Sequence, residues 1–387
     1  MSEVLFEITK EQLETGLRGY PVGYCTTSSV DPQQGLSYMG MPVPDLADWQ
    51  PEEVIYLLYH GEKGNEKQIA AFTQDLRTRA KLSPEVTKHI CQLPRKGHPM
   101  ELFCAALLIC GMFENKNDYQ EDCLNLIAKV PELVATVINH HAGWGPTKPS
   151  KPDLGYIENF TQMLNTPSGN ATELTRVFKL FNILHYDHGG GNLSTFVGKA
   201  VASGLEDMYG SISAAMAALA GPKHGRANQD CLEFVKDVMK QVGENATAQQ
   251  VESLIRKRLA NNELVFGFGH AVLRVEDPRA TIFYKEAQQR YKQDPLVKIA
   301  TLLREVGPKV LKENPKISNP YPNVDAVSGV LLTAGGFPYP EYYTVLFGLA
   351  RVVGISIQIV YERCFARNGK GTPIVRPKYF FKRKEEI

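Results

Sequence analysis

The sequence predicts an all-α protein of two domains with a small β-hairpin region near the N-terminus. Two observations support the helical class. From about residue 51 onward, apolar residues recur every three or four positions, and Gly or Pro separates the successive stretches. The hairpins are predicted over residues 15–45, where Gly, Pro and Thr are frequent and short pieces alternate between apolar and polar side chains.

The predicted helices follow in order after the hairpin region. Early candidates occupy residues 52–60, 65–81, 84–92 and 98–113. Residues 171–184 place their apolar side chains on one face, and residues 297–306 repeat this pattern before Gly307 and Pro308, which we expect to end the helix. The stretch 192–219 is rich in Ala, Gly and Ser on nearly every side, so we expect one helix deep among others.

The longest apolar run, residues 345–361, predicts a buried helix. Arg351, Gly354, Ser356 and Gln358 interrupt it, which makes it too polar for a membrane span. Arg351 has no acidic residue three or four positions away. Its charge therefore needs a more distant partner, either an internal carboxylate or the carboxylate of a ligand.

Composition narrows the class of function. The 387 residues carry a net charge of +1, and this balance gives no sign of binding to nucleic acid or to a membrane. The seven cysteines are scattered without a CxxC pair, so we expect them to be reduced. The N-terminus shows no leader pattern. This predicts a bacterial cytoplasmic protein, with the mitochondrial matrix after removal of a leader as the alternative.

Changes of polarity near residues 225–230 and 335–340 predict a hinge at each end of an inserted segment. We expect residues 1–225 to form the first part of a large helical domain. Residues 226–336 would form a small helical domain, and residues 337–387 the C-terminal part of the large one.

The first segment with unusual chemistry is AAMAALAGPKHGRAN, at 214–228. Gly221 and Pro222 end a small-residue helix and leave His224 near the start of the next helix. A helix N-terminus disfavours protonation of an imidazole, so we expect a neutral ring that donates one hydrogen bond. A histidine that merely packs in the turn is the alternative.

The second segment is HYDHGGGN, at 185–192. His185 and His188 flank Asp187 as they would in a metal site, but no further set of ligands at suitable spacing accompanies them, so we expect no metal. The three glycines allow the backbone to approach a small ligand, with His188 as a donor. A capped tight turn explains the segment equally well.

The third segment is LVFGFGHAVLRVEDPR, at 264–279. Gly267 and Gly269 flank an aromatic residue beside His270 and two arginines. Such a loop can cradle an anionic cofactor with main-chain amides, and a plain glycine-rich loop is the alternative. It does not follow a strand in a βαβ unit, which disfavours a dinucleotide-binding fold.

The fourth segment, NPYPNVDAVSGVLL at 319–332, brings Asp325 to the start of an apolar helix. An N-cap carboxylate is the usual role for an aspartate there. Apolar neighbours also remove water from the carboxylate, which raises its pKa and makes it a usable base.

Together these segments resemble the citrate synthase family of mitochondria and some bacteria, over nearly the whole chain. The resemblance rests on GPKHGRANQ, FGHAVLRVEDPR, NPYPNVDAVSGVLL and YYTVLFGLARVVG in this order, with DHGGGN in support. It implies a citrate synthase-like two-domain fold and a homodimer, in which the small domain closes over oxaloacetate before acetyl-CoA is engaged. It also implies citrate formation through an enolate and hydrolysis of citryl-CoA, with no metal and no tightly bound cofactor.

The resemblance assigns roles to individual residues. Asp325 would remove a proton from the acetyl methyl group, His224 would hydrogen-bond the thioester carbonyl, and His270 would polarise the ketone of oxaloacetate. The residues expected to hold oxaloacetate are His188, Arg279, Arg351 and, from the partner subunit, Arg376. The residues expected to bind coenzyme A are Leu264, Val265, Phe266, Gly267, Phe268, Gly269, Arg274 and Lys316. Phe266 and Ser318 depart from the family's pattern, which has a proline and often a basic residue there.

Two other functions fit the same motifs. A 2-methylcitrate synthase would use propionyl-CoA, and one extra methylene changes discrimination by only about 1–3 kcal/mol, so motifs do not separate the two. A catalytically silent helical protein could keep the scaffold to bind coenzyme A. The joint presence of Asp325, His224 and His270 argues against that second alternative.

Overall fold

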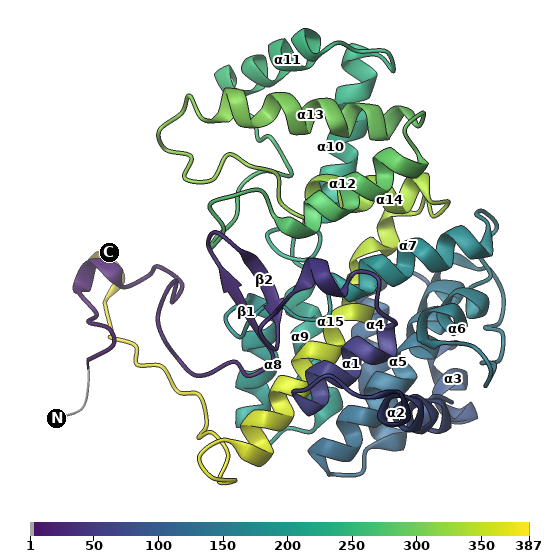
Figure 1. The fold of residues 1–387 in the computed structure, drawn as a ribbon. Helices are drawn as coiled ribbons and strands as arrows, with labels where there is room; N and C mark the ends of the chain where they lie inside the picture. Colours follow the sequence, from purple (N-terminus) through teal and green to yellow (C-terminus); the bar gives the residue numbers. More distant parts are fainter. Residues whose placement is uncertain (1–3, 387) are drawn as a thin grey trace.

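The computed structural model describes residues 4–386, and its helices pack in two groups, one above the other in Figure 1. The lower group contains α1 Pro51–His60, α2 Glu66–Arg79, α3 Pro84–Ile90, α4 Pro99–Glu114, α5 Tyr119–Ala142, α6 Tyr156–Met163, α7 Ala171–Ile183, α8 Leu193–Ser203, α9 Met208–Leu219 and α15 Tyr343–Val360. The upper group contains α10 Ala227–Val242, α11 Ala248–Ala260, α12 Pro278–Arg290, α13 Pro295–Leu311 and α14 Asp325–Ala334. The predicted all-α class is confirmed. The division of the chain at residues 225 and 336 stays a prediction.

The predicted hairpin region forms one small antiparallel sheet. Its strands are β1 Ser28–Asp31, β2 Gly35–Tyr38 and β3 Met41–Pro42, in the order β1-β2-β3. Ser28 lies opposite Tyr38, and Asp31 lies opposite Gly35. Because side chains alternate across a strand, Ser28 is buried while its neighbour Ser29 is exposed. The sheet lies at the junction of the two helical groups (Figure 1).

Helix α15 is the central helix of the lower group. All of its residues are buried, and it packs against α5, α7, α8 and α9. The longer stretch Pro340–Phe365 has the length and apolar composition to cross a membrane, but its most apolar window is completely buried inside the protein. This matches the buried helix that the sequence predicted, and it places Arg351 in the protein interior.

The helices differ from those that the sequence predicted in three places, two of them at helix ends. The stretch 192–219 is two helices, α8 and α9, because the chain turns at Gly204 and Leu205, and Asp207 then caps α9 by accepting from the Gly210 amide. Helix α13 does not end at Gly307 and Pro308. It continues to Leu311, since Val310 and Leu311 bury their side chains in the core.

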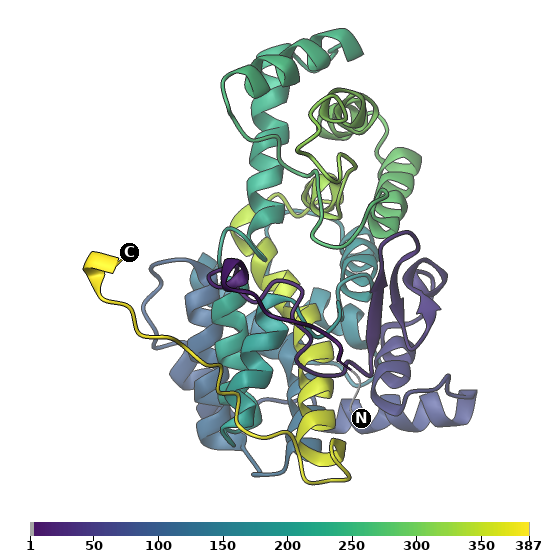
Figure 2. The same ribbon diagram turned by 90° about the vertical axis from the view of Figure 1, so that its left-hand side faces the viewer.

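Helix α5 was missed. It contains Pro131, a residue that usually breaks a helix, yet it runs unbroken from Tyr119 to Ala142 because most of its length is buried. The chain after α15 is different again: from Ala366 onward it is mostly extended and exposed, and Figure 2 shows it running along the outside of the helices.

Candidate active site

Two loops of the upper group are fastened to each other and bring the third and fourth segments together. The amide of Gly269 donates to the Tyr321 carbonyl (3.1 Å), and the amide of Asn323 donates to the Gly267 carbonyl (2.9 Å). The side-chain amide of Asn323 also donates to the Gly269 carbonyl, at 3.0 Å. His270 follows one loop and Asp325 follows the other, so this pairing fixes their backbones as neighbours.

The two glycines of the third segment serve this close approach. Gly267 has a φ of +82°, and a Cβ placed there would lie 2.8 Å from Cα of Ala326, at the start of α14. The Gly269 amide is already bonded to Tyr321. The glycines therefore allow the loop to pack on α14, and the Gly269 amide is not free to cradle an anion.

The ring of His270 has a defined tautomer. Its Nδ1 accepts hydrogen bonds from the amides of Val272 and Leu273, both at 3.0 Å, so the proton of the neutral ring is on Nε2. Burial, together with the nearby charge of Arg279, lowers the pKa of His270 to about 4. Near pH 7 the ring is therefore neutral and has one N–H to donate.

His224 is neutral for a related reason. Its Nε2 accepts from the backbone amide of Ser194 at 3.2 Å and lies 2.9 Å from the Ser194 hydroxyl. Burial lowers its pKa to about 4, and Arg351 adds to the effect. The proton is therefore on Nδ1. The helix N-terminus that bonds to this ring is that of α8, whereas the sequence had suggested the next helix, α10.

Asp325 is the first residue of α14, and the cap position belongs to Val324. The Asp325 amide donates to Oδ1 of Asn323 at 3.0 Å, while its own carboxylate makes no hydrogen bond within residues 4–386. Burial raises the pKa of Asp325 to about 7, although Arg279 and Arg351 act in the opposite direction. The carboxylate is thus not an N-cap, and its pKa is matched to proton transfer near neutral pH.

Two buried arginines lie beside these groups, and only one of them has an ion-pair partner. The guanidinium of Arg279 donates to both oxygens of Asp277, at 3.1 and 2.8 Å. Arg351 is 2% exposed and donates from Nε to the His185 carbonyl at 3.0 Å. Within the described residues no carboxylate comes within ion-pair distance of Arg351. Burial lowers its pKa to about 10, and Asp187 opposes this shift.

His188 lies beside His270 and near both arginines. Its ring centroid is 5.4 Å from that of His270. Burial lowers the pKa of His188 well below its ordinary value, and Arg279 and Arg351 lower it further. Its Nε2 is buried without a hydrogen-bond partner. A buried polar atom without a partner is costly, so an unpartnered nitrogen beside an unpaired arginine indicates a site for an anionic ligand.

Several predicted residues lie at the surface. Leu264, Arg274 and Lys316 are exposed. Arg274 donates to the carbonyls of Val272 (2.9 Å) and Leu273 (2.7 Å), and the Lys316 side chain makes no hydrogen bond or ion pair in the described part of the chain. The rings of Phe266 and Phe234 pack with their centroids 5.9 Å apart, next to partly buried Val265.

Phe268 packs against α13 at Gly307, where a Cβ would lie 2.3 Å from the ring.

Arg376 is also exposed, and it does not lie with the other residues expected to hold oxaloacetate. Its neighbour Val375 donates to the Ser203 hydroxyl at 2.9 Å, at the C-terminal end of α8. His224 contacts the N-terminal end of that helix. A helix of 11 residues is about 16 Å long, so Arg376 is remote from the site of its own chain.

Sequence reasoning missed the residues that hold the site in place. These include Ser194, Asn323 and Asp277. Asp277 was the most accessible to prediction, because an aspartate before Pro-Arg at a helix start is a capping pattern, and it does accept from the Arg279 amide. Ser194 and Asn323 act through contacts distant in sequence, which no local pattern reveals.

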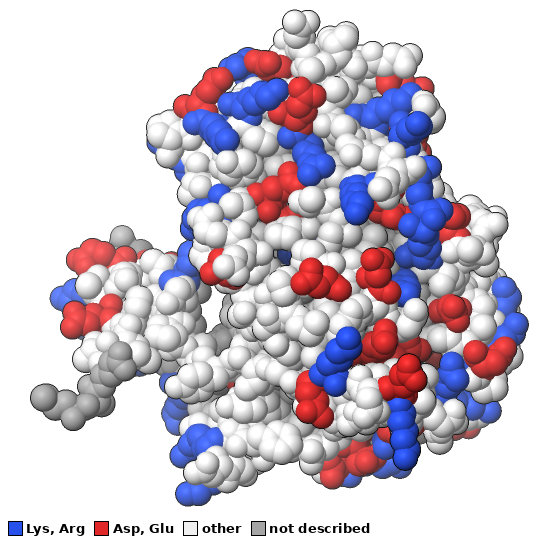
Figure 3. Space-filling model, in the orientation of Figure 1, with Lys and Arg blue, Asp and Glu red and all other residues white. Residues whose placement is uncertain are grey.

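The structure also bears on the other ligand classes. Across residues 4–386 no three His, Cys, Asp or Glu side chains gather as a metal site. His185 instead stacks on Phe181, with ring centroids 4.3 Å apart. On the face in Figure 3, Lys and Arg are interspersed with Asp and Glu and do not form one continuous basic patch.

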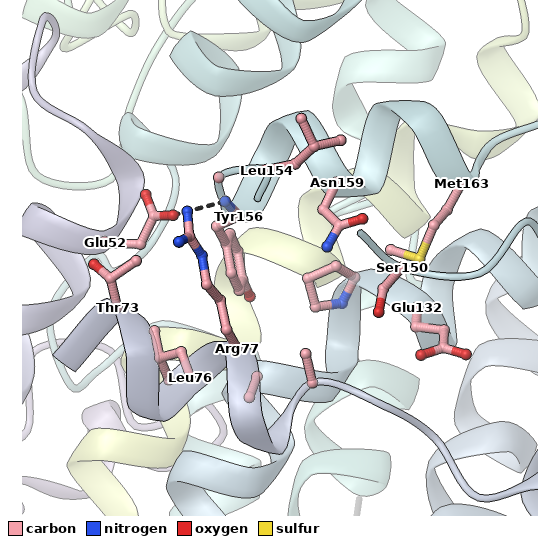
Figure 4. A pocket seen from close by; sticks show the side chains of 14 residues that line it. Glu52, Thr73, Leu76, Arg77, Glu132, Ser150, Leu154, Tyr156, Asn159 and Met163 are labelled. Carbon is pink, nitrogen blue, oxygen red and sulfur yellow. Dashed lines mark hydrogen bonds between the residues drawn. The ribbon is translucent and has the colours of Figure 1, made fainter. Parts of the chain in front are cut away.

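A separate small cavity lies between α2, α5 and α6 (Figure 4). Its volume of about 30 Å³ has room for about two water molecules. Glu52 there accepts from the Tyr156 amide at 2.7 Å. None of the predicted site residues lines it.

Known proteins resemble the chain over almost its full length. "Citrate synthase 4, mitochondrial" of Arabidopsis thaliana is 36% identical, over 97% of this chain and 82% of that protein. "2-methylcitrate synthase, mitochondrial" of Yarrowia lipolytica is 34% identical, over 97% of this chain and 85% of that protein.

A crystal structure of citrate synthase from Thermotoga maritima has a TM-score of 0.82 at 26% identity, covering 97% of both chains. The Thermoplasma acidophilum citrate synthase, solved in a ternary complex with carboxymethyl coenzyme A and oxaloacetate, has a TM-score of 0.82 at 27% identity. That match covers 95% of this chain and 96% of the other.

The prediction that the protein is located in a bacterial cytoplasm is wrong, as the names of its relatives show. Curated relatives from plants, an insect, a nematode and a yeast all carry the word mitochondrial in their names. They point to the mitochondrial matrix. The absence of a leader pattern at the first residues was a weak basis, because the rest of the chain resembles these mitochondrial enzymes.

The family model described as "Citrate synthase, C-terminal domain" matches residues 16–378. This match spans every group of the site described above, from His188 to Arg351. The chain belongs to the citrate synthase family.

Proposed function

We propose that this enzyme condenses acetyl-CoA with oxaloacetate and water to give citrate and coenzyme A. Two buried groups carry the proposal. Arg351 has no ion-pair partner in the described chain, and Nε2 of His188 has no hydrogen-bond partner there. Oxaloacetate is a small dianion with a ketone oxygen. It would supply a carboxylate to the guanidinium and an acceptor to the imidazole, which satisfies both groups at once.

The first step binds and orients oxaloacetate. Arg351 is free to pair with one carboxylate, and Arg279 shares its charge with Asp277 but adds positive potential. His270 holds its proton on Nε2 and would donate it as a hydrogen bond to the ketone oxygen, which makes the ketone carbon more electrophilic. The proton stays on the ring while oxaloacetate binds.

The second step forms the nucleophile. Asp325 takes a proton from the methyl group of acetyl-CoA, and the electron pair of the C–H bond moves into the thioester as an enolate. His224 donates Nδ1–H to the enolate oxygen. A carboxylate alone is too weak a base for a thioester methyl group, so this donor is essential. Loss of one such donor typically lowers kcat by on the order of 10²–10³.

The third step joins the two substrates and releases the product. The enolate carbon attacks the ketone carbon of oxaloacetate, which forms the new C–C bond while the π electron pair of the ketone moves to its oxygen. This oxygen takes the Nε2 proton of His270 and becomes the hydroxyl of citryl-CoA; the ring regains a proton from solvent as Asp325 releases the one it took. Water then cleaves the thioester, giving citrate and the free thiol of coenzyme A. We assign coenzyme A recognition to the loop 264–270 with Arg274 and Lys316. The loop is hydrogen-bonded to the Asp325 loop through Asn323, and Leu264, Arg274 and Lys316 are exposed.

A 2-methylcitrate synthase activity is the second candidate, because a relative with that name is as similar as several citrate synthases. The test is thiol release with oxaloacetate and either acetyl-CoA or propionyl-CoA. A higher kcat/KM for acetyl-CoA supports the first proposal. Preference for propionyl-CoA would favour the second candidate, and a folded protein with no turnover would favour the silent CoA-binding alternative.

The role of Arg351 can be separated from turnover. We expect oxaloacetate to raise the melting temperature of the wild-type enzyme, because a ligand that binds only the folded state stabilises it. Arg351→Gln should lose most of this rise while remaining folded, since the substitution removes a buried and unpaired charge. An undiminished rise would show that Arg351 does not bind the dianion.

We further propose a homodimer in which Arg376 of the partner subunit completes the site. Arg376 is exposed and remote from the site of its own chain, and exposed apolar residues accompany it: Ile374, Val375, Tyr379, Phe380 and Phe381. An extended apolar segment of this kind is typical of an interface. Co-expressed Arg376→Ala and Asp325→Asn subunits should give mixed dimers with one intact site, and no activity above either parent would contradict this assignment.

A further inference from the structure

The orientation of His188 is set by its backbone, because its ring has no fixed partner. Ser28, on strand β1, contacts the residue on each side of it. The Ser28 hydroxyl donates to Oδ2 of Asp187 at 2.7 Å and accepts from the Gly189 amide at 2.7 Å. One side chain therefore fastens both neighbours of His188.

The remaining contacts of Asp187 strengthen this attachment. Its carboxylate is fully buried. It accepts further hydrogen bonds from the Thr27 hydroxyl at 2.5 Å and from the Gln358 side-chain amide at 2.9 Å. Its backbone amide donates to the Tyr38 hydroxyl at 3.2 Å. Thr27 and Tyr38 belong to the same hairpin as Ser28, so the base of the hairpin holds the segment before and after His188.

The turn end of the same hairpin contacts the loop that carries His270. The carbonyl of Pro32 accepts from the Arg274 amide at 2.8 Å. Gly35 has a φ of +89° and lies so close to Pro278, at the start of α12, that a Cβ would come within 2.6 Å of its ring. The hairpin therefore touches the lower group at His188 and the upper group between His270 and Arg279.

We propose that Ser28 is a positioning residue, and that the β1–β2 hairpin holds His188 at its working distance from His270 across the junction of the two helical groups. The inference rests on the proposed function, because it takes His188 to be a ligand of oxaloacetate. Ser28 touches no substrate. It acts by fixing the backbone on both sides of His188, so its loss changes oxaloacetate binding first.

The experiment compares Ser28→Ala with Ser29→Ala. Ser29 is the next residue of β1 and is exposed on the opposite face, so it is a matched control of the same size and strand. Ser28→Ala should raise the KM and the dissociation constant for oxaloacetate about tenfold, which corresponds to the loss of one hydrogen bond that holds the backbone around His188. Ser29→Ala should leave both unchanged, and Ser28→Thr, which keeps the hydroxyl, should recover most of the affinity.

This pattern differs from simple destabilisation. A smaller folded fraction lowers kcat without altering the KM of the molecules that remain folded. Equal KM values for Ser28→Ala and Ser29→Ala, in an active enzyme, would overturn the inference, whereas an inactive wild-type enzyme would instead overturn the proposed function. If Ser28→Ala does not fold, Thr27→Val removes another donor to Asp187 at similar volume. An unchanged KM in that variant would equally contradict the inference.

Discussion

Three groups of the site have pKa values displaced towards the forms that the proposed reaction needs. Burial raises the pKa of Asp325 to about 7, and it lowers those of His224 and His270 to about 4. The same physical cause acts in opposite directions because burial always disfavours the charged form. Between pH 5 and 9 the two imidazoles are neutral donors, and Asp325 is the only one of the three whose charge changes.

This displacement predicts the pH dependence of turnover. Asp325 must be ionised to accept a proton, so kcat/KM for acetyl-CoA should rise with pH and reach half of its maximum near pH 7. Asp325→Asn should lower kcat by about 10²–10⁴, the usual contribution of a general base. Steady-state kinetics from pH 5.5 to 8.5 measures both effects, and a flat profile for the wild-type enzyme would remove Asp325 as the base.

The same substitution has a predicted effect on stability. The folded-state pKa of about 7 lies above the ordinary value of 3.8, so the contribution of Asp325 to stability is present below pH 3.8 and is lost as the pH rises through 7. Asp325→Asn should therefore unfold at a higher temperature than the wild type at pH 8, with the difference shrinking towards pH 4. Thermal unfolding in the two buffers provides the control for folding of the inactive variant.

At the scale of single residues, the sequence predicted the reacting side chains better than the residues that hold them in position. His224, Asp325 and Arg351 are unusual residue types in their local sequence, which is why they could be singled out. Ser194 lies 30 residues from His224, and only the packing of α8 beside the following turn brings them together. Ser28 is further still from Asp187 along the chain. Such contacts depend on tertiary structure, so no local pattern contains them.

At the scale of elements, turn residues were the least reliable guide. Gly307 and Pro308 have the composition of a helix end, but apolar side chains after them are buried and the helix continues. Gly204 ended α8 although the small residues around it favoured a single long helix. At Gly307 and Pro308 the burial of the following side chains outweighed the local preference of Gly and Pro, whereas at Gly204 the local preference of Gly prevailed.

Gly307 has another function in this fold. The Phe268 ring lies on the helix surface at this glycine, where a Cβ would overlap it at 2.3 Å. We expect Gly307→Ala to push Phe268 and its loop away from α13, which costs about 1–3 kcal/mol in overpacking. The predicted result is a higher KM for acetyl-CoA, with a much smaller change in the KM for oxaloacetate.

The control for this variant is Glu305→Ala, on the exposed face of the same helix. It breaks an exposed ion pair with Lys309, which contributes little to stability. Steady-state kinetics with each substrate varied in turn distinguishes the two variants. Equal KM values for acetyl-CoA in both would mean that the position of Phe268 is not important for coenzyme A binding.

At the scale of the whole molecule, the two helical groups meet at more than the active site. Arg176 on α7 pairs with Glu286 on α12 through two hydrogen bonds, at 2.5 and 2.8 Å. Glu173 on α7 accepts from the Tyr291 hydroxyl at 2.5 Å, just beyond the end of α12. Helix α12 begins beside Arg279, so these contacts hold the far end of the helix whose first turn reaches the site.

If residues 226–336 move as the predicted small domain, the contacts between α7 and α12 stabilise the arrangement in which the site is assembled. Glu286→Gln keeps the size of the side chain and removes its charge. Because Arg176 is partly exposed, we expect a loss of less than about 1 kcal/mol, which raises the KM for oxaloacetate by about fivefold at most. High salt should raise the wild-type KM in the same direction and leave the variant less affected.

The matched control is Glu305→Gln, which removes an equivalent charge from an ion pair within a single helix and should not change the KM for oxaloacetate. Small-angle scattering adds an independent measurement, because weaker contact between the groups should increase the radius of gyration of the free Glu286→Gln protein, and oxaloacetate should reduce it again. Unchanged kinetics and scattering in Glu286→Gln would mean that the ion pairs on α12 follow the arrangement of the two groups without stabilising it, and that closure depends on the ligand and the active-site loops alone.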